Sequence, residues 1–240
     1  MGSETLEFAM YDRRLRENLP RVQEAIGRAA ERSGRDSGEV TLVAITKAHS
    51  SDAVEAAIAS GIGHIGENRV EELEERVRLL GRRVATWHMV GHVQSRKARR
   101  AGEVSDLIHS VDTLKLARKI SSFGLDRDER VPVLLEVNLS GEETKSGFTP
   151  AFAKEAVHQA LGLGGLDVRG LMTMAPFTDD EGVLRSVFSR LREIHEEAGK
   201  LPSYAGRELS MGMTNDFELA VEEGSTMVRI GTALFGERPR

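Results

Sequence analysis

The chain has 240 residues, of which 40% are hydrophobic and 24 are glycine, so it can bury a core of barrel size. Its formal net charge of −5 argues against a nucleic-acid-binding protein, because binding to phosphate backbones usually requires a basic surplus. The lack of cysteine excludes disulfides, thiolate metal sites and thiol catalysis. No apolar run is long enough to span a membrane and no signal-peptide pattern opens the chain, which predicts a cytoplasmic protein.

The first predicted element is an amphipathic helix over residues 4–35, in which Leu15, Leu19, Val22 and Ile26 form one apolar stripe. Short apolar runs then alternate with polar stretches of helical length. Strands are predicted over residues 40–46, 63–66, 86–90, 106–111, 131–138, 167–174, 207–211 and 226–230. Helices are predicted near residues 51–60, 67–80, 94–102, 113–123, 150–161, 180–198 and 215–223. This alternation is typical of parallel strands joined by crossover helices.

The number of repeating units favours an α/β fold of one particular kind. Eight strand–helix units in about 200 residues fit a single (β/α)8 TIM barrel over residues 1–240, with an extra N-terminal helix. A doubly wound open sheet is the alternative, but it would normally carry a glycine-rich turn after its first strand, and "TKAHSS" contains no glycine. The "GLGG" segment at 162–165 is predicted to stop a helix before the sixth strand.

Lys47 is the first candidate for chemistry, because it stands where the first predicted strand ends. Active groups of (β/α)8 barrels gather at the C-terminal ends of the strands. A lysine based on a packed strand loses part of its hydration and is easier to deprotonate, which favours imine formation with an aldehyde. A solvated surface lysine is the alternative that position alone leaves open.

The loops after the last two strands are candidates for an anion site. Barrel enzymes often bind phosphate there, where free backbone N–H groups face the ligand. The segment "SMGMTND" offers Gly212 for close backbone approach and Thr214 as a cap for the next helix, while "RIGTALFG" offers Gly231 and Thr232. Each glycine could equally serve a simple turn, and the carboxylate of Asp216 lies near the proposed anion.

A lysine that can form an imine, facing a phosphate site, suggests a phosphorylated aldehyde, and pyridoxal 5′-phosphate is the obvious candidate. Arg229, at the end of the eighth predicted strand, would then lie close to the pyridine nitrogen. An arginine at that position disfavours protonation of the ring and so weakens the cofactor as an electron sink. A surface ion pair is the alternative role for this arginine.

Several motifs together resemble the pyridoxal-phosphate homeostasis proteins, the YggS/PROSC-like family. They are "ITKAHS", "GHIGENRVEE", "WHMVGHVQSRKA", "LLEVNLSGEETKSGF", "VRGLMTMAP" and "LSMGMTNDFELAVEEGSTMVRIGTALFG", and they run from about residue 10 to residue 237. The resemblance implies a barrel like the N-terminal domain of alanine racemase, monomeric or weakly associating, with the cofactor held as a Schiff base on Lys47.

The resemblance also assigns residues to the cofactor site. It implies that Asn68 approaches the ring, that His88 lines the mouth and that Met174 belongs to the wall. Arg229 corresponds to the neighbour of the pyridine nitrogen. The phosphate site corresponds to five residues of the last two loops, Ser210, Gly212, Thr214, Gly231 and Thr232.

The resemblance leaves catalysis less certain than the ligand. Racemisation needs proton transfer on both faces of the cofactor, and alanine racemase supplies a tyrosine from a second domain for one of them. The chain ends about where the barrel ends, and neither Tyr11 nor Tyr204 lies in a motif that would present a base. A carrier or regulator of pyridoxal phosphate without turnover is therefore expected. One alternative is an amino-acid racemase or related enzyme. Another is an interaction protein whose barrel docks on apoenzymes or division machinery, with the cofactor as a structural ligand.

Three further patterns receive non-catalytic interpretations. His88 and His92 could suggest a metal pair, but no nearby carboxylate completes a set, so no metal is expected. The basic run at 94–100 is interpreted as a solvated helix face rather than an RNA contact. The glycine-punctuated loop over residues 138–147 is a candidate cover for the cofactor.

Overall fold

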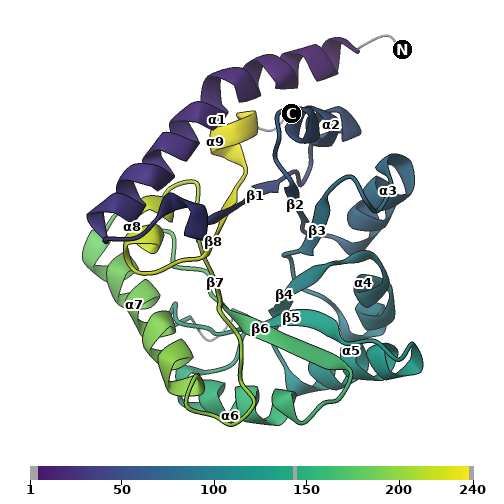
Figure 1. The fold of residues 1–240 in the computed structure, drawn as a ribbon, viewed down its shortest axis with the longest axis vertical. Helices are drawn as coiled ribbons and strands as arrows, with labels where there is room; N and C mark the ends of the chain where they lie inside the picture. The colour runs from purple at the N-terminus through teal and green to yellow at the C-terminus, as the bar shows by residue number, and fades with distance from the viewer. Residues whose placement is uncertain (1–4, 143–144, 238–240) are drawn as a thin grey trace.

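The computed structural model describes residues 5–142 and 145–237, and they form a closed barrel of eight parallel strands (Figure 1). Each strand pairs with its neighbour in sequence, and the barrel closes where Thr41 pairs in register with Met227. The strands are β1 (Thr41–Ile45), β2 (His64–Glu67), β3 (Thr86–Met89), β4 (Leu107–Val111), β5 (Val131–Glu136), β6 (Leu166–Met172), β7 (Glu208–Met213) and β8 (Met227–Ile230). Closure confirms the predicted (β/α)8 barrel and excludes the open sheet.

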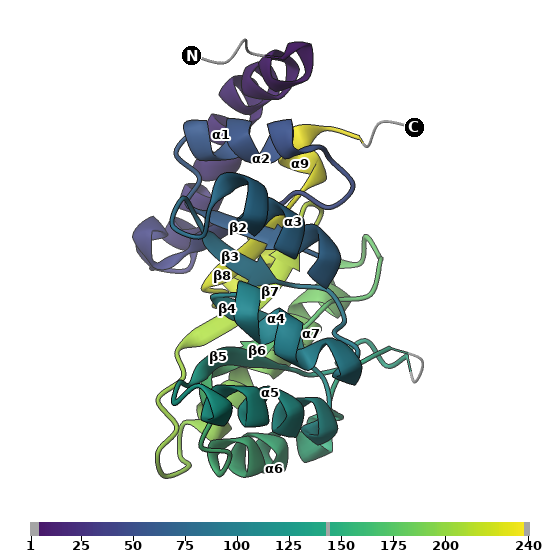
Figure 2. The ribbon, with the colours of Figure 1, turned by 90° about the vertical axis from the view of Figure 1, so that its right-hand side faces the viewer.

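Helices surround the strands and cover the outer surface of the barrel (Figure 2). They are α1 (Leu6–Arg32), α2 (Ser51–Ala59), α3 (Val70–Leu80), α4 (Ala98–Val104), α5 (Leu114–Asp126), α6 (Pro150–Leu161), α7 (Glu181–Ala198), α8 (Phe217–Glu222) and α9 (Thr232–Phe235), with short 3-10 helices at Ser37–Glu39 and Ser95–Lys97. Within the described part of the chain, no helix is both long and apolar enough to cross a membrane.

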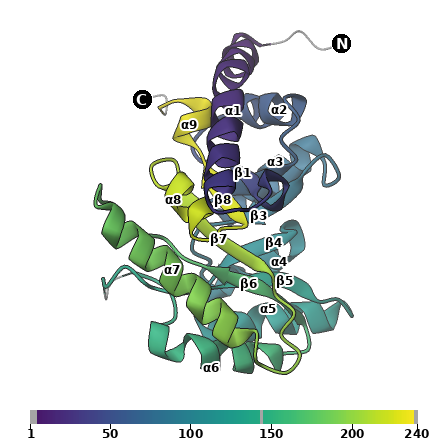
Figure 3. The ribbon, with the colours of Figure 1, turned by 60° about the vertical axis from the view of Figure 1, so that its left-hand side comes forward.

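The extra N-terminal helix is confirmed and has a definite place. Thr5 caps α1 by accepting a hydrogen bond from the backbone N–H of Phe8 at 3.0 Å. The predicted stripe from Leu15 to Ile26 is buried, and α1 packs against α2, α8 and α9 (Figure 3). Because α8 and α9 are short, α1 supplies much of the cover where the barrel closes between β8 and β1.

Element boundaries differ from the prediction mainly at the strand ends. The helix expected from residue 67 begins at Val70, because β2 continues through Glu67, and α8 begins at Phe217 rather than at residue 215. The predicted helix stop after α6 is confirmed, with Gly162 as the C-cap. The alternation of apolar and polar residues indicates where a strand lies, but the turn that ends it depends on contacts with neighbouring elements.

The interior of the barrel contains two separate apolar clusters. Leu107, Leu134, Met172 and Met227 form one of them, and none of these lines the functional cavity described below. Val43, Ile45 and Val90 form the other, which lies against that cavity. Buried polar side chains lie beside both clusters: Arg229 pairs in register with Val43, and His88 pairs with Leu107.

Candidate functional site

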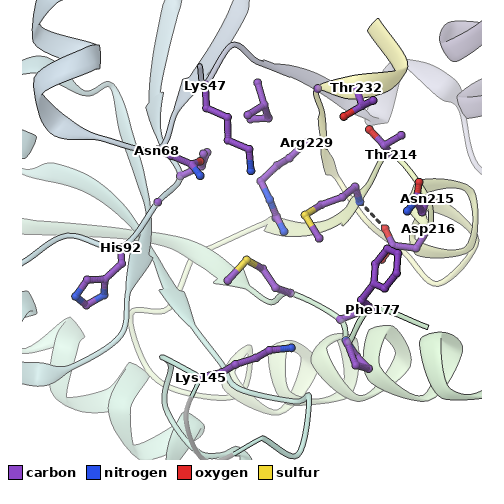
Figure 4. Close-up of a pocket in the computed structure, with 18 of the residues that line it drawn as sticks. Lys47, Asn68, His92, Lys145, Phe177, Thr214, Asn215, Asp216, Arg229 and Thr232 are labelled. Atoms are coloured by element: carbon purple, nitrogen blue, oxygen red, sulfur yellow. Dashed lines mark hydrogen bonds between the residues drawn. The ribbon is translucent and has the colours of Figure 1, made fainter. Parts of the chain in front are cut away.

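A cavity of about 440 Å³ opens at the C-terminal ends of the strands (Figure 4). This volume lies within the range of pockets that hold small ligands and cofactors, roughly 300–1,000 Å³. Its described lining comes from the ends of β1, β5, β7 and β8 and from the segments that follow every strand except β4. The end of the barrel that carries it is the end at which barrel enzymes place their active groups.

Lys47 enters this cavity from the end of β1. Side chains alternate along a strand, so Lys47 follows Val43 and Ile45 on the inward face. It is partly buried, and its side chain extends into the same space as that of Arg229 (Figure 4). The next residue, Ala48, has φ of 62°, a left-handed conformation that turns the chain immediately after the lysine. The amine is therefore fixed at its base by a packed strand and a tight turn.

A buried polar network supports the outer side of this turn. Thr46 donates a 2.7 Å hydrogen bond to Oε1 of Glu67, whose carboxyl group is fully buried. Arg76 donates to the carbonyl oxygen of His49 at 2.6 Å, and His49 Nδ1 lies 2.9 Å from the hydroxyl of Tyr11. Burial raises the pKa of Glu67 to about 7, although the Thr46 bond and the nearby Arg76 act in the opposite direction. The network ties the segment around Lys47 to β2, α3 and α1.

Arg229 lines the cavity from β8, yet only 5% of its surface is exposed. Its Nη1 donates to Ser210 Oγ at 2.5 Å, and its Nη2 donates to the carbonyl oxygen of Thr173 at 2.9 Å. Burial lowers the pKa of Arg229 to about 10, while Asp216 and Glu136 act in the opposite direction. The guanidinium is therefore still charged at neutral pH and is held by two acceptors.

The loops after β7 and β8 meet at one side of the cavity, as predicted. Thr214, Gly231 and Thr232 line it, and the backbone N–H of Ala233 points to the Thr214 hydroxyl at 3.4 Å. A Cβ atom at Gly231 would lie 3.2 Å from the carbonyl oxygen of Ile45. Two hydroxyl groups and a glycine backbone thus face one corner, which suits an anion.

The expected role of Thr214 as a helix cap is wrong. Asp216 occupies the N-cap position of α8, and its carboxylate accepts a 2.5 Å bond from the backbone N–H of Met213. This bond folds the loop so that Thr214 faces α9 instead of α8. Burial raises the pKa of Asp216, while the Met213 bond and Arg229 act in the opposite direction.

Three predicted site residues lie behind the cavity wall. His88 is 1% exposed inside the barrel, bonded to two other histidines, so its expected position at the mouth is corrected. Ser210 is buried beneath Arg229. Gly212 has φ of +93°, and a Cβ atom there would lie 2.6 Å from Ala220 Cβ, so this glycine serves the approach of α8 to β7. The other predicted residues line the cavity together: Lys47, Asn68, Met174, Thr214, Arg229, Gly231 and Thr232.

The sequence interpretation overlooked Glu136, which ends β5, lines the cavity and is 4% exposed. Burial and the neighbouring Asp112 raise the pKa of Glu136 to about 7, whereas Arg229 and His92 act in the opposite direction. The same strand-end rule that selected Lys47 would have found it, since Glu136 follows the apolar run "VPVLL".

The structure also describes the surroundings of the His88 and His92 pair, of the basic run at 94–100 and of the loop over residues 138–147. His92 lies 2.9 Å from Asp112, and among residues 5–142 and 145–237 no group of three His, Asp or Glu side chains is placed to hold a metal ion. In the basic run, Lys97 at the end of a 3-10 helix and Arg100 on α4 both pair with Glu71 on α3. In the candidate cover loop, Lys145 and Ser146 line the cavity, while residues 143–144 lie outside the described part. Its role as a cover stays a prediction.

These features define a (β/α)8 barrel with a cavity at the C-terminal ends of its strands, around which lie the amine of Lys47, the buried guanidinium of Arg229 and an anion corner formed by Thr214, Gly231 and Thr232. The chain belongs to the pyridoxal phosphate homeostasis proteins and carries the alanine racemase N-terminal domain, whose family model matches residues 14–239. This confirms the resemblance seen in the sequence motifs.

Individual relatives extend over nearly the whole chain. The pyridoxal phosphate homeostasis protein of Aquifex aeolicus is 39% identical over 222 residues, which are 92% of this chain and 97% of the relative. A crystal structure of a Bifidobacterium adolescentis protein is 41% identical, with a TM-score of 0.87 and coverage of 94% of this chain and 96% of that one. PipY of Synechococcus elongatus, solved with pyridoxal phosphate bound, is 36% identical, with a TM-score of 0.78 and coverage of 87% and 100%.

Proposed function

We propose that the protein binds pyridoxal 5′-phosphate as a Schiff base on Lys47 and takes part in pyridoxal phosphate homeostasis as a carrier or regulator. The observation that carries this proposal is the convergence of Lys47 and Arg229 on one cavity (Figure 4). Thr214, Gly231 and Thr232 belong to the lining of the same cavity. PipY, a relative with the same fold, contains this cofactor in its solved structure.

The residues present fit the cofactor in chemistry as well as in volume. When bound, the cofactor supplies an aldehyde for the amine of Lys47. The hydroxyl groups of Thr214 and Thr232 and the backbone of Gly231 would hold its phosphate. Arg229 would lie near the pyridine nitrogen, and because its guanidinium can only donate hydrogen bonds, it disfavours a protonated ring.

The arrangement of the tyrosines favours binding without turnover. Tyr11 is buried with its ring against Phe235 of α9 and its hydroxyl 2.9 Å from His49 Nδ1, and the hydroxyl of Tyr204 lies 2.9 Å from His195 Nδ1. Neither tyrosine belongs to the described lining of the cavity. We further propose that the protein acts as a cytoplasmic monomer and delivers the cofactor to pyridoxal-phosphate-dependent apoenzymes.

An amino-acid racemase or related enzyme is the second candidate, and Glu136 is the observation that favours it. This carboxyl group lines the cavity, and burial raises its pKa to about 7, so it could accept and return a proton at neutral pH. Steady turnover of an amino acid well above that of the free cofactor would establish this alternative. A stoichiometric spectral change without turnover supports the carrier.

Borohydride reduction tests the proposed function. The loaded protein should show an absorbance band in the near-visible region, and reduction should add the cofactor mass to the peptide that contains Lys47. Lys47→Ala should lose both, while Lys145→Ala, which removes the other lysine of the described lining, should retain the modified peptide. An unmodified Lys47 peptide in the wild-type protein would refute the Schiff base.

A further inference from the structure

Four polar side chains form a continuous hydrogen-bonded chain beneath Arg229 inside the barrel. Nδ1 of His64 lies 3.0 Å from Nε2 of His88, and Nδ1 of His88 lies 2.8 Å from Nε2 of His109. Nδ1 of His109 lies 2.9 Å from the hydroxyl of Ser210, which accepts the bond from Arg229. The chain therefore runs from β2 through β3, β4 and β7 to the arginine on β8.

Burial favours the neutral form of these three histidines at neutral pH. Burial lowers the pKa of His88 to about 3, with a smaller contribution from His64. Burial also lowers the pKa of His109 well below its usual value, and the neighbouring His88 and Arg229 act in the same direction. Burial also lowers the pKa of His64, while Glu208 acts in the opposite direction. A neutral imidazole has one donor and one acceptor nitrogen, so each link in the chain has a direction.

The donor and the acceptor in each of these hydrogen bonds follow from Arg229. Arg229 can only donate, so Ser210 Oγ accepts from it, and the hydroxyl hydrogen of this buried serine finds its acceptor in Nδ1 of His109. Nε2 of His109 must then carry the hydrogen and donate to His88, and Nε2 of His88 must donate to His64.

We propose that Ser210, His109, His88 and His64 are positioning residues for Arg229: they form one directional chain of hydrogen bonds in which every histidine carries its hydrogen on Nε2. The chain leaves Ser210 Oγ free to accept from Arg229, and together with the carbonyl of Thr173 it fixes one edge of the guanidinium. The remaining N–H groups then have a fixed direction relative to the cavity. The effect of this hydrogen-bonded chain on ligand binding rests on the proposed function. The hydrogen bonds themselves do not depend on it.

Nitrogen-15 NMR of the ligand-free protein at neutral pH tests the chain directly. His64, His88 and His109 should each show a protonated Nε2 and an unprotonated Nδ1. Protonated Nδ1 in His88 or His109 would overturn the proposal. His195, whose Nδ1 bonds to Tyr204 outside the barrel interior, is an internal reference that should not change among the variants described next.

Substitution of Ser210 separates positioning from simple packing. Ser210→Ala removes the donor to His109, so the nitrogen-15 signal of His109 Nδ1 should move toward that of an unprotonated nitrogen without a hydrogen bond, while Ser210→Thr retains the hydroxyl and should keep the wild-type signal. An unchanged His109 Nδ1 signal in folded Ser210→Ala would refute the donation from Ser210 to His109, from which the direction of the other hydrogen bonds follows.

Ligand binding supplies the second measurement. Ser210→Ala leaves a buried donor of Arg229 without its acceptor, so the dissociation constant for pyridoxal phosphate should rise about tenfold, and Ser210→Thr should restore it. Wild-type affinity in Ser210→Ala would overturn the positioning role. If the wild-type protein has the expected tautomers and yet binds no pyridoxal phosphate, the proposed function is wrong but the directional series of hydrogen bonds is confirmed.

Discussion

Thr46 donates a 2.7 Å hydrogen bond to Glu67 on the outer side of the barrel, one residue before the lysine that enters the cavity. Side-chain alternation separates the two: Lys47 faces inward, while Thr46 faces the layer between strands and helices. The backbone next to Lys47 is thus held from the layer between the strands and the helices, by the carboxyl group of Glu67. Burial raises the pKa of this group to about 7, so it is partly protonated at neutral pH.

Glu67→Gln should make the free energy of unfolding less dependent on pH. Burial raises the pKa of Glu67 from 4.5 to about 7, so the folded protein holds a proton that the unfolded chain releases between these values. The stabilising contribution is fully present below pH 4.5 and is lost as the pH rises through about 7. Across this window the wild-type protein should lose roughly 3 kcal/mol more than Glu67→Gln.

Urea unfolding at a series of pH values measures this difference. Glu75→Gln is the matched control, because Glu75 is exposed on α3 and should leave the wild-type slope unchanged. Parallel slopes in the wild type and Glu67→Gln would mean that Glu67 is ionised throughout.

Ala48→Gly should stabilise the fold by about 1 kcal/mol, because glycine adopts the left-handed conformation at φ of 62° without the steric cost that alanine has there. Ala9→Gly provides the opposite case: Ala9 is exposed in α1, where glycine should cost about 1 kcal/mol. Equilibrium unfolding compares the two. Equal destabilisation by both substitutions would show that Ala48 is not strained.

The position of Lys47 was predictable from sequence because strand periodicity is local. The apolar run before it predicted β1, and the barrel rule placed its end at the cavity. The same reasoning misplaced His88, because its inward direction and its bonds to His64 and His109 depend on three strands meeting inside the barrel. A single sequence contains no sign of those contacts.

The anion corner was also predictable only in part. Small residues after β7 and β8 marked the two loops, and Thr214 and Thr232 do face the cavity. The role of Gly212 depends on how closely α8 approaches β7, and the N-cap depends on how the loop folds around Asp216. These are tertiary contacts, which residue spacing does not determine.

Gly212→Ala should destabilise the protein by at least about 2 kcal/mol. Its φ of +93° disfavours any Cβ atom, and that atom would lie 2.9 Å from the backbone Cα of Phe217, which cannot move without α8. Gly27→Ala is the control, because a Cβ atom there meets nothing within 4 Å and alanine favours a helix. Thermal unfolding should show a lower midpoint for the first variant and a slightly higher one for the second.

Thr232→Val should weaken pyridoxal phosphate binding about tenfold or more, because it removes a hydroxyl group from the anion corner while it keeps the side-chain shape. Pyridoxal, which lacks the phosphate, is the control ligand, and its affinity should be the same for wild type and variant. Equal weakening for both ligands would show that Thr232 does not contact the phosphate.

Glu136→Gln should change how cofactor affinity depends on pH. Because burial raises the pKa of Glu136 to about 7, this cavity-lining group becomes an anion as the pH rises through that value and then repels a ligand that carries a phosphate. The affinity of the wild type relative to Glu136→Gln should therefore fall as the pH rises through about 7. Glu67→Gln is a close control: burial raises the pKa of Glu67 to a similar value, but Glu67 does not belong to the described lining. Titration of each variant with pyridoxal phosphate on both sides of neutral pH checks this, and a constant affinity ratio between wild type and Glu136→Gln would show that Glu136 does not ionise within reach of the ligand.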